Sequence, residues 1–203
     1  ISKEKLALKA IDIEQNQMEE NCGSQDQIWA SYGGINYIKF NKNGKFNVNK
    51  LKLSNSYKNN LNDNLVLIYT GIHKYSNNVE KDKIVNLKNN IKYLDSIHEI
   101  TKKYKKIINS SQSIENLGDM LNEYWFLKKK LSTKVTNHKI DEIYNAALNS
   151  GAAGGKIIGS GGGGFLLVYC KKKHQKLLKS NLKKLVFVKI KFTDEGSKII
   201  FKS

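Results

Sequence analysis

The sequence of 203 residues contains neither proline nor arginine, so all 35 of its basic residues are lysines. A formal net charge of +17 would by itself suggest a nucleic acid or an acidic surface as partner. Arginine, however, supplies most of the bidentate contacts to guanine and phosphate, and its absence argues against such a partner. The charge is more typical of a lysine-biased composition that is also rich in asparagine and isoleucine. We therefore expect no nucleic-acid partner.

Cysteine and long apolar runs are also scarce. Cys22 and Cys170 lie far apart in a chain too large to depend on a disulfide, which favours a reduced, cytoplasmic setting. Neither cysteine has the spacing of a metal site. No apolar run approaches the ~18 residues of a membrane helix, and we expect no signal peptide and no membrane partner. Because the sequence begins at Ile1 and enters a helical pattern at once, we expect further residues upstream.

Most of the glycine lies in one run, from Gly151 to Gly164. Glycine is entropically costly to order, so such density requires a reason. One reason is a loop whose backbone N–H groups approach an anion such as phosphate. The alternative is a flexible linker, which usually mixes glycine with serine and lacks flanking strands. Within this run, apolar residues at 157–158 precede the loop that begins at Gly159, and others follow it at 165–168, which favours the functional loop.

The glycine run does not match two known phosphate-binding motifs. The glycines at 159, 161 and 164 have the spacing of the dinucleotide motif, but here the run opens a strand where that motif opens a helix. The Walker A motif fails because Ser150 stands where glycine is required and Ile157 where serine or threonine should hold a metal. A different kind of glycine loop is therefore indicated.

Periodicity and turn signals predict an α+β chain with helices packed on one face of a small, mostly antiparallel sheet. The polar, turn-rich segment 54–64 is the expected domain boundary. Helix caps are expected at Ser2, Ser113 and Asn137. The expected helices are 2–20, a short one after Gly23, 84–108 (with a break allowed), one after Ser113, one after Asn137, and 172–182. The expected strands are 35–40, 46–53, 65–69, 165–169, 186–190 and 196–201.

Asp26 is the clearest candidate for chemistry outside the glycine run. It lies at the start of the short helix, where N–H groups and the helix dipole stabilise a carboxylate. An aspartate in this place can also serve only as a helix cap. The residues alone leave both interpretations of Asp26 open, a chemical role and a capping role.

Several segments together resemble the GHMP sugar and isoprenoid kinases, and most of all their D-glycero-D-manno-heptose 7-phosphate kinase branch. The glycine run is similar to the third motif of that family. The other segments that carry the resemblance are Gly23-Ser24-Gln25-Asp26-Gln27 with Tyr32-Gly33-Gly34, Tyr69-Thr70-Gly71, Leu117 to Lys128, and Ile140 to Tyr144. They span essentially the whole chain in the order of the family.

The resemblance implies the GHMP kinase fold, with 1–56 as the end of the N-terminal domain and 57–203 as a ferredoxin-like C-terminal domain. It implies phosphoryl transfer from ATP, with Mg²⁺, to the anomeric hydroxyl of a heptose 7-phosphate. Asp26 would accept or orient the hydroxyl proton, and no residue is assigned as a metal ligand. Sugar-phosphate contacts are expected from Gln25, Gly33, Gly34, Thr70 and Lys156, and phosphate contacts from Gly159, Ser160, Gly161, Gly162 and Gly163.

The sequence also departs from the family. Ser24 stands where this branch more often has lysine, and Ile72-His73-Lys74 follows Gly71 where an arginine is usual. The N-terminal strands and serine-rich nucleotide loop of the family have no counterpart in these residues. Since phosphoryl transfer depends on positioning, we expect the activity to need that upstream segment. A non-catalytic segment that binds sugar phosphate, a kinase for another sugar, and a homodimer all stay open.

Overall fold

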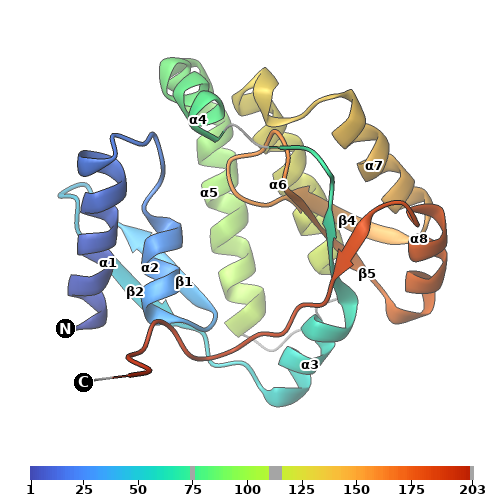
Figure 1. The fold of residues 1–203 in the computed structure, drawn as a ribbon, viewed down its shortest axis with the longest axis horizontal. Coiled ribbons are helices and arrows are strands. Elements are labelled where there is room, and N and C mark those ends of the chain that lie inside the picture. The colour runs from blue at the N-terminus through green and yellow to red at the C-terminus, as the bar shows by residue number, and fades with distance from the viewer. Residues whose placement is uncertain (74–75, 110–115, 202–203) are drawn as a thin grey trace. The chain divides into compact units, whose positions relative to one another are not determined.

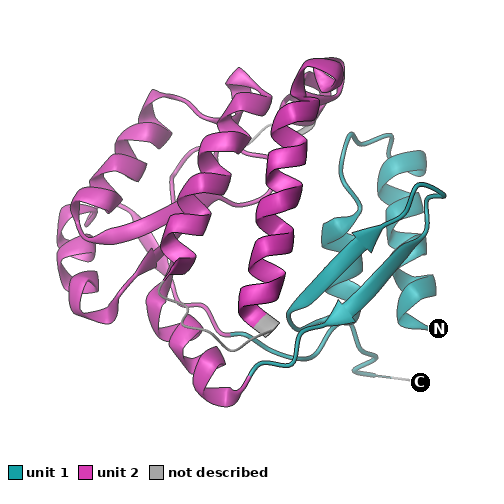
Figure 2. Ribbon diagram, turned by 180° about the vertical axis from the view of Figure 1, so that it is seen from behind, with its two compact units in different colours: residues 1–53, 192–203 teal, residues 54–191 magenta. Residues whose placement is uncertain are grey.

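The computed structural model describes residues 1–73, 76–109 and 116–201 of the chain (Figure 1). The chain forms two compact units, one of residues 1–53 with 192–203 and one of residues 54–191 (Figure 2). We call them unit 1 and unit 2. The junction at 53/54 lies close to the predicted boundary at 56/57, but residues 192–203 return to unit 1. The assignment of 1–56 and 57–203 to the two family domains stays a prediction.

Unit 1 combines helices with one hairpin. Ser2 caps α1 (Lys3–Asp12) by accepting a hydrogen bond from the Lys5 N–H, as predicted, and a π-helical turn (Ile13–Gln17) continues it. Then follow α2 (Gln25–Tyr32), β1 (Asn36–Phe40) and β2 (Phe46–Lys50), and the two strands pair antiparallel. The predicted hairpin is confirmed, with Gly44 in the turn at φ 77°.

The last residues of unit 1 do not form the predicted strand 196–201, so that prediction is wrong. The segment is irregular, because its backbone bonds the end of a helix instead of a neighbouring strand. The Ser197 N–H donates to the Ala30 carbonyl at 2.9 Å. Gly196 packs so closely on residues 31–33 that a Cβ there would lie 2.4 Å from the Ser31 carbonyl oxygen.

Unit 2 is built on a four-stranded sheet of strand order β4-β5-β3-β6, in which every pairing is antiparallel. The strands are β3 (Leu65–Tyr69), β4 (Ala152–Ile157), β5 (Phe165–Cys170) and β6 (Val186–Val188). Alternate residues of the two central strands, Val66 and Ile68 with Leu166 and Val168, join the core on one face. The predicted antiparallel sheet is confirmed.

Helices of unit 2 cover that face. Trp125 from α6, Tyr144 from α7 and Leu178 from α8 belong to the same buried cluster as the strand residues, and Figure 1 shows α6 and α7 running beside β4. Asn137 caps α7 through the Ile140 N–H, as predicted. The helices are α3 (Asn55–Asn64), α4 (Ser76–Val85), α5 (Leu87–Asn109), α6 (Leu117–Leu131), α7 (His138–Asn149) and α8 (Gln175–Asn181), with 3₁₀ turns at Thr133–Val135 and Lys172–His174.

Two predictions for unit 2 differ in outcome: segment 54–64 needs correction, whereas the helix at 84–108 is present with the break that was allowed. Segment 54–64 is α3 and not a turn-rich linker, because Ser54 caps it and Leu61 is buried, which outweighs the weak helix propensity of asparagine. The apolar spacing at 84, 87, 91 and 94 is broken between α4 and α5, and those side chains remain more than one third exposed. The predicted cap Ser113 lies outside the described residues.

The first part of the glycine run serves packing, since residues 152–157 form β4. The α6 backbone approaches β4 so closely that neither contact residue has room for a side chain. A Cβ on Gly118 would lie 2.4 Å from the Ala153 Cβ, and one on Gly154 would lie 2.0 Å from the Gly118 carbonyl oxygen. Close packing explains these glycines without a ligand.

Gly118→Ala tests this contact. Alanine stabilises a helix interior by about 1 kcal/mol over glycine, but here the added methyl group overlaps Ala153, so we expect the free energy of unfolding to fall by about 1–3 kcal/mol. Urea denaturation measures the change. Gly23→Ala is the control, because no atom lies within 4 Å of its added Cβ; equal stability of the two variants would contradict the prediction.

Candidate active site

The glycine loop, defined here as residues 158–164, joins β4 to β5. Gly159, Gly161, Gly162 and Gly164 all have positive φ, from 72° to 109°. Gly161 is the most constrained of them, because a Cβ there would also lie 2.8 Å from the Val135 carbonyl oxygen. The conformation of the loop therefore requires glycine.

Surrounding segments of unit 2 anchor the loop. The Gly162 N–H donates to the Val135 carbonyl at 2.7 Å, and the Gly164 N–H donates to the Ile72 carbonyl at 3.0 Å. The Gly164 carbonyl accepts from both the N–H (2.9 Å) and the hydroxyl (2.8 Å) of Thr70, whose side chain is buried. These bonds fix both the middle and the end of the loop.

Four other N–H groups of the loop have no hydrogen-bond partner among the described residues: those of Gly159, Ser160, Gly161 and Gly163. Ser160, Gly161 and Gly163 are nevertheless buried. Nearly all buried backbone N–H groups in proteins are paired with protein, water or ligand. Successive unpaired N–H groups in a glycine-rich turn form a concavity suited to an anion.

Asp26 lies in unit 1, in the first turn of α2. The carboxylate is exposed and has no hydrogen-bond partner among the residues that the structure describes. Ser24 is the N-cap residue, makes no side-chain capping bond, and instead accepts from the Gln15 amide at 3.1 Å. Asp26 is thus not occupied in capping its helix and is available to a ligand.

The other predicted residues of unit 1 surround the same helix. Gln25 is exposed at the first position of α2. Gly33 follows the helix with φ 67°, and a Cβ there would lie 2.1 Å from the backbone of Glu195 and Gly196. The Gly34 carbonyl accepts from the Trp29 indole N–H at 2.8 Å. Both glycines therefore have structural roles, whatever their part in binding.

Lys156 lies on β4 and not in the glycine loop. Its ammonium group is 4.1 Å from the centre of the Tyr124 ring, a cation–π contact. Burial, reinforced by the charge of Glu80, raises the pKa of Tyr124, so the ring stays neutral. His73 is exposed, and Lys74 lies outside the described residues.

The structure thus divides the predicted site residues between the two units. Thr70, Lys156 and residues 159–163 belong to unit 2, whereas Gln25, Asp26, Gly33 and Gly34 belong to unit 1. Two lysines of unit 2 that bond the glycine loop, Lys128 and Lys83, were not predicted. Lys128 follows Leu117, Leu121 and Trp125 at helical spacing, so it continues the apolar stripe that these residues form along α6. That position was the sequence signal for its burial.

No group of three or more His, Cys, Asp or Glu side chains that could hold a metal ion occurs in the part of the chain that the structure describes. Mg²⁺ in phosphoryl-transfer sites is commonly bound by one or two carboxylates together with phosphate oxygens and water. The described residues therefore offer no metal site built from protein ligands alone. Among the described helices, none is both long and apolar enough to cross a bilayer.

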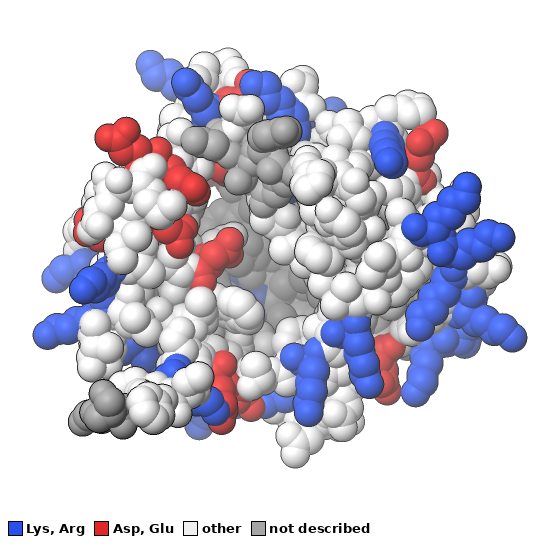
Figure 3. Space-filling view, viewed as in Figure 1, with Lys and Arg blue, Asp and Glu red and all other residues white. Residues whose placement is uncertain are grey.

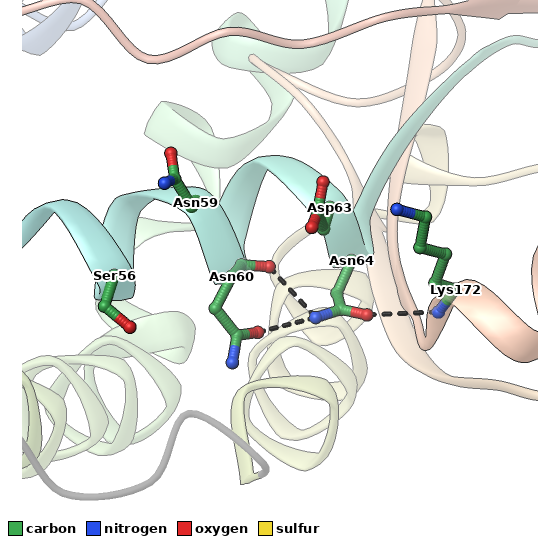
Figure 4. Close-up of a pocket in the computed structure, with 6 residues that line it drawn as sticks. All are labelled: Ser56, Asn59, Asn60, Asp63, Asn64 and Lys172. Atoms are coloured by element: carbon green, nitrogen blue, oxygen red, sulfur yellow. Dashed lines mark hydrogen bonds between the residues drawn. The ribbon is translucent and has the colours of Figure 1, made fainter.

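A polar depression lies away from the loop, between α3 and the start of the 3₁₀ turn at Lys172 (Figure 4). The Asn64 amide donates to the carbonyl and side-chain oxygens of Asn60, and its own oxygen accepts from the Lys172 N–H. Both ends of the Asn64 side-chain amide are therefore hydrogen-bonded within the protein. The residues that line it are Ser56, Asn59, Asn60, Asp63, Asn64 and Lys172.

Part of the lysine excess is concentrated after β5. Residues 171–184 include seven lysines and no acidic residue, and all seven are exposed. Figure 3 shows lysine side chains gathered along the right edge of the view, where α8 lies in Figure 1, and acidic residues interspersed with lysines elsewhere. This edge attracts anions over about 10 Å at 0.1 M salt.

This chain is similar in sequence to known proteins. Residues 97–186 match the family model described as GHMP kinases C terminal. The chain is 30% identical over 197 residues to D-glycero-alpha-D-manno-heptose 7-phosphate kinase of Campylobacter jejuni subsp. jejuni. That alignment covers 95% of this chain and 58% of the relative, so the chain spans well under two thirds of the relative's length.

Solved structures give the same fold. A putative sugar kinase from Campylobacter jejuni superposes with a TM-score of 0.72 at 28% identity, covering 97% of this chain and 56% of that one. A D-glycero-D-manno-heptose 1-phosphate kinase from Bacteroides thetaiotaomicron superposes with a TM-score of 0.74 at 22% identity, covering 99% and 57%. The predicted GHMP kinase fold and the resemblance to heptose phosphate kinases are confirmed.

Thr70→Val tests the anchoring of the loop. The substitution keeps the shape of the side chain but removes the hydroxyl that bonds the Gly164 carbonyl and accepts from the Ile72 N–H. We expect the free energy of unfolding to fall by about 1–3 kcal/mol and amide exchange to accelerate across the loop. Thr70→Ser retains the hydroxyl and is the control; a loop equally protected in both variants would show that the hydroxyl is dispensable.

Proposed function

We propose that this chain, which has the GHMP kinase fold, is part of an ATP-dependent kinase acting on D-glycero-D-manno-heptose 7-phosphate. The product would be the 1,7-bisphosphate, an intermediate of nucleotide-activated heptose synthesis. The observation that carries phosphoryl transfer is the glycine loop, in which four N–H groups have no partner among the residues that the structure describes. The choice of heptose rests on the 30% identical relative.

In the proposed reaction the anomeric hydroxyl oxygen attacks the γ-phosphorus of ATP. A new C–O–P linkage forms, the bond from the γ-phosphorus to the bridging oxygen breaks, and ADP leaves. The hydroxyl proton passes to Asp26 or is oriented by it. The carboxylate of Asp26 is exposed and does not cap its helix, which supports this role. A general base of this kind contributes about 10²–10⁴-fold in rate.

The glycine loop is proposed to act on the phosphoryl group that is transferred. Its N–H groups at residues 159–161 and 163 are fixed donors, and fixed donors stabilise the charge that builds on phosphoryl oxygens without reorganising during the reaction. We assign Gly162 a role in shaping the loop, since its own N–H bonds the Val135 carbonyl. ATP would supply the phosphoryl group, and Mg²⁺ bound to ATP would neutralise phosphate charge.

The remaining proposed contacts are to the sugar phosphate. Gln25 is exposed next to Asp26 and supports such a role directly. We retain Gly33, Gly34, Thr70 and Lys156 as proposed sugar contacts, although each also has a structural partner within its own unit. For Lys156 that partner is the Tyr124 ring, so sugar phosphate would have to bind beside an ammonium group already held in place.

Asp26→Asn removes the proposed proton acceptor. We expect sugar-dependent ADP release by the protein to fall by about 10²–10⁴-fold, with little change in stability because the carboxylate bonds no other described residue. Asp95→Asn, a change of another exposed aspartate, is the matched control and should retain full turnover. Undiminished turnover in Asp26→Asn would remove Asp26 from the mechanism.

A substrate series separates heptose 7-phosphate from its alternatives. We expect the kcat/KM of the protein for D-glycero-D-manno-heptose 7-phosphate to exceed the values for heptose 1-phosphate, galactose and fucose by at least tenfold, or about 1.4 kcal/mol of transition-state binding. Coupled ADP release measures each value. A higher kcat/KM for one of the other sugars would reassign the substrate while leaving the phosphoryl-transfer proposal in place.

A further inference from the structure

Two lysine ammonium groups bond the carbonyl oxygens of the glycine loop. Lys128 of α6 is only 3% exposed, and its ammonium group donates to the Ile157 carbonyl at 3.3 Å and to the Gly159 carbonyl. Lys83 of α4 donates to the Ser160 carbonyl at 2.8 Å and to the Glu80 carboxylate at 2.8 Å. Consecutive carbonyls of the loop, at 159 and 160, are therefore each held by a cation from a different helix.

Burial of Lys128 requires an explanation. Lysine is almost never fully buried unless its charge is paired or bonded, and the neighbouring lysines of the same helix lie at the surface. Lys129 contacts Asp141 at 3.5 Å, and Lys130 lies over the Phe126 ring and is exposed. Lys128 alone of the three points onto the sheet side of α6, where its ammonium group meets the end of β4.

The two bonds determine the direction of the unpaired N–H groups. In a trans peptide, the C=O of one residue and the N–H of the next point to opposite sides of the chain. A Gly159 carbonyl directed at Lys128 turns the Ser160 N–H away from Lys128. In the same way, a Ser160 carbonyl directed at Lys83 turns the Gly161 N–H away from Lys83.

These two directed N–H groups are among the four that lack a partner among the described residues. An ammonium group on the carbonyl side of a peptide also polarises that peptide and strengthens its N–H as a donor. The loop thus has its carbonyl oxygens at 159 and 160 bonded by cations, while its N–H groups at 160 and 161 are available, which is the arrangement that a phosphoryl oxygen needs.

We propose that Lys128 and Lys83 are positioning residues that hold the Ser160 and Gly161 N–H groups in the orientation that binds a phosphoryl group. Neither lysine needs to touch the substrate. The proposal rests on the proposed function for the identity of the anion, which is a phosphate of the nucleotide or the group in transfer. It adds to that function the residues through which the loop keeps its binding conformation.

The test uses Lys128→Met and Lys83→Met, which keep most of the apolar stem and remove the ammonium group. Titration of the protein with ADP and with inorganic phosphate, followed by the ¹⁵N–¹H signals of Ser160 and Gly161, measures anion binding at these two amides. In the unmodified protein both signals should shift on binding. Each variant should lose that response and show at least tenfold weaker ADP affinity, with kcat reduced about 10²-fold and the KM for sugar nearly unchanged.

Lys130→Met is the control, since it removes an exposed lysine from the same helix and should behave as the unmodified protein. If Lys128→Met fails to fold, Lys83→Met decides the question, because its ammonium group is nearer the surface. Unaltered shifts and ADP affinity in the folded variants would overturn the proposal. Absence of any shift at Ser160 and Gly161 in the unmodified protein would also overturn it, whereas sugar-dependent ADP release in that same protein would show that the proposed function survives.

Discussion

The close approach of α6 to β4 is the constraint on which unit 2 depends. Gly118 and Gly154 allow the helix backbone to lie almost directly on the strand. From that contact α6 extends its apolar stripe across the sheet, places Trp125 in the core and brings Lys128 to the end of β4. A larger residue at the contact would lift the helix and withdraw the lysine from the loop carbonyls.

In the glycine loop, the backbone carbonyl oxygens and the backbone N–H groups differ in their hydrogen-bond partners. Its carbonyl oxygens at 159, 160 and 164 bond Lys128, Lys83 and Thr70, whereas several of its N–H groups have no partner in the described part of the chain. An ordinary tight loop would satisfy its donors and acceptors among its own residues. The two lysines and Thr70 thus hold these three acceptors, while the donors at 159–161 and 163 are left in an arrangement suited to an anion.

Local signals in the sequence predicted the elements whose causes are local. Ser2 and Asn137 cap their helices, and Gly44 turns its hairpin, because a few neighbouring residues decide these features. The helix at 54–64 was not predicted, because the weak helix propensity of asparagine conceals it. The strand 196–201 was predicted wrongly, because its backbone bonds Ala30, which is distant in sequence. Lys128 was missed because the carbonyl oxygens that it bonds, at 157 and 159, are distant in sequence, although its position in line with Trp125 indicated burial.

The return of residues 192–203 to unit 1 has a consequence for the order of folding. Unit 2 is continuous in sequence, whereas unit 1 is assembled from residues on both sides of it. Protein domains generally fold as they leave the ribosome. All of unit 2 is therefore synthesised before the segment that packs on Gly33 exists, so the sheet and glycine loop can be complete while the unit that holds Asp26 still awaits its last contacts.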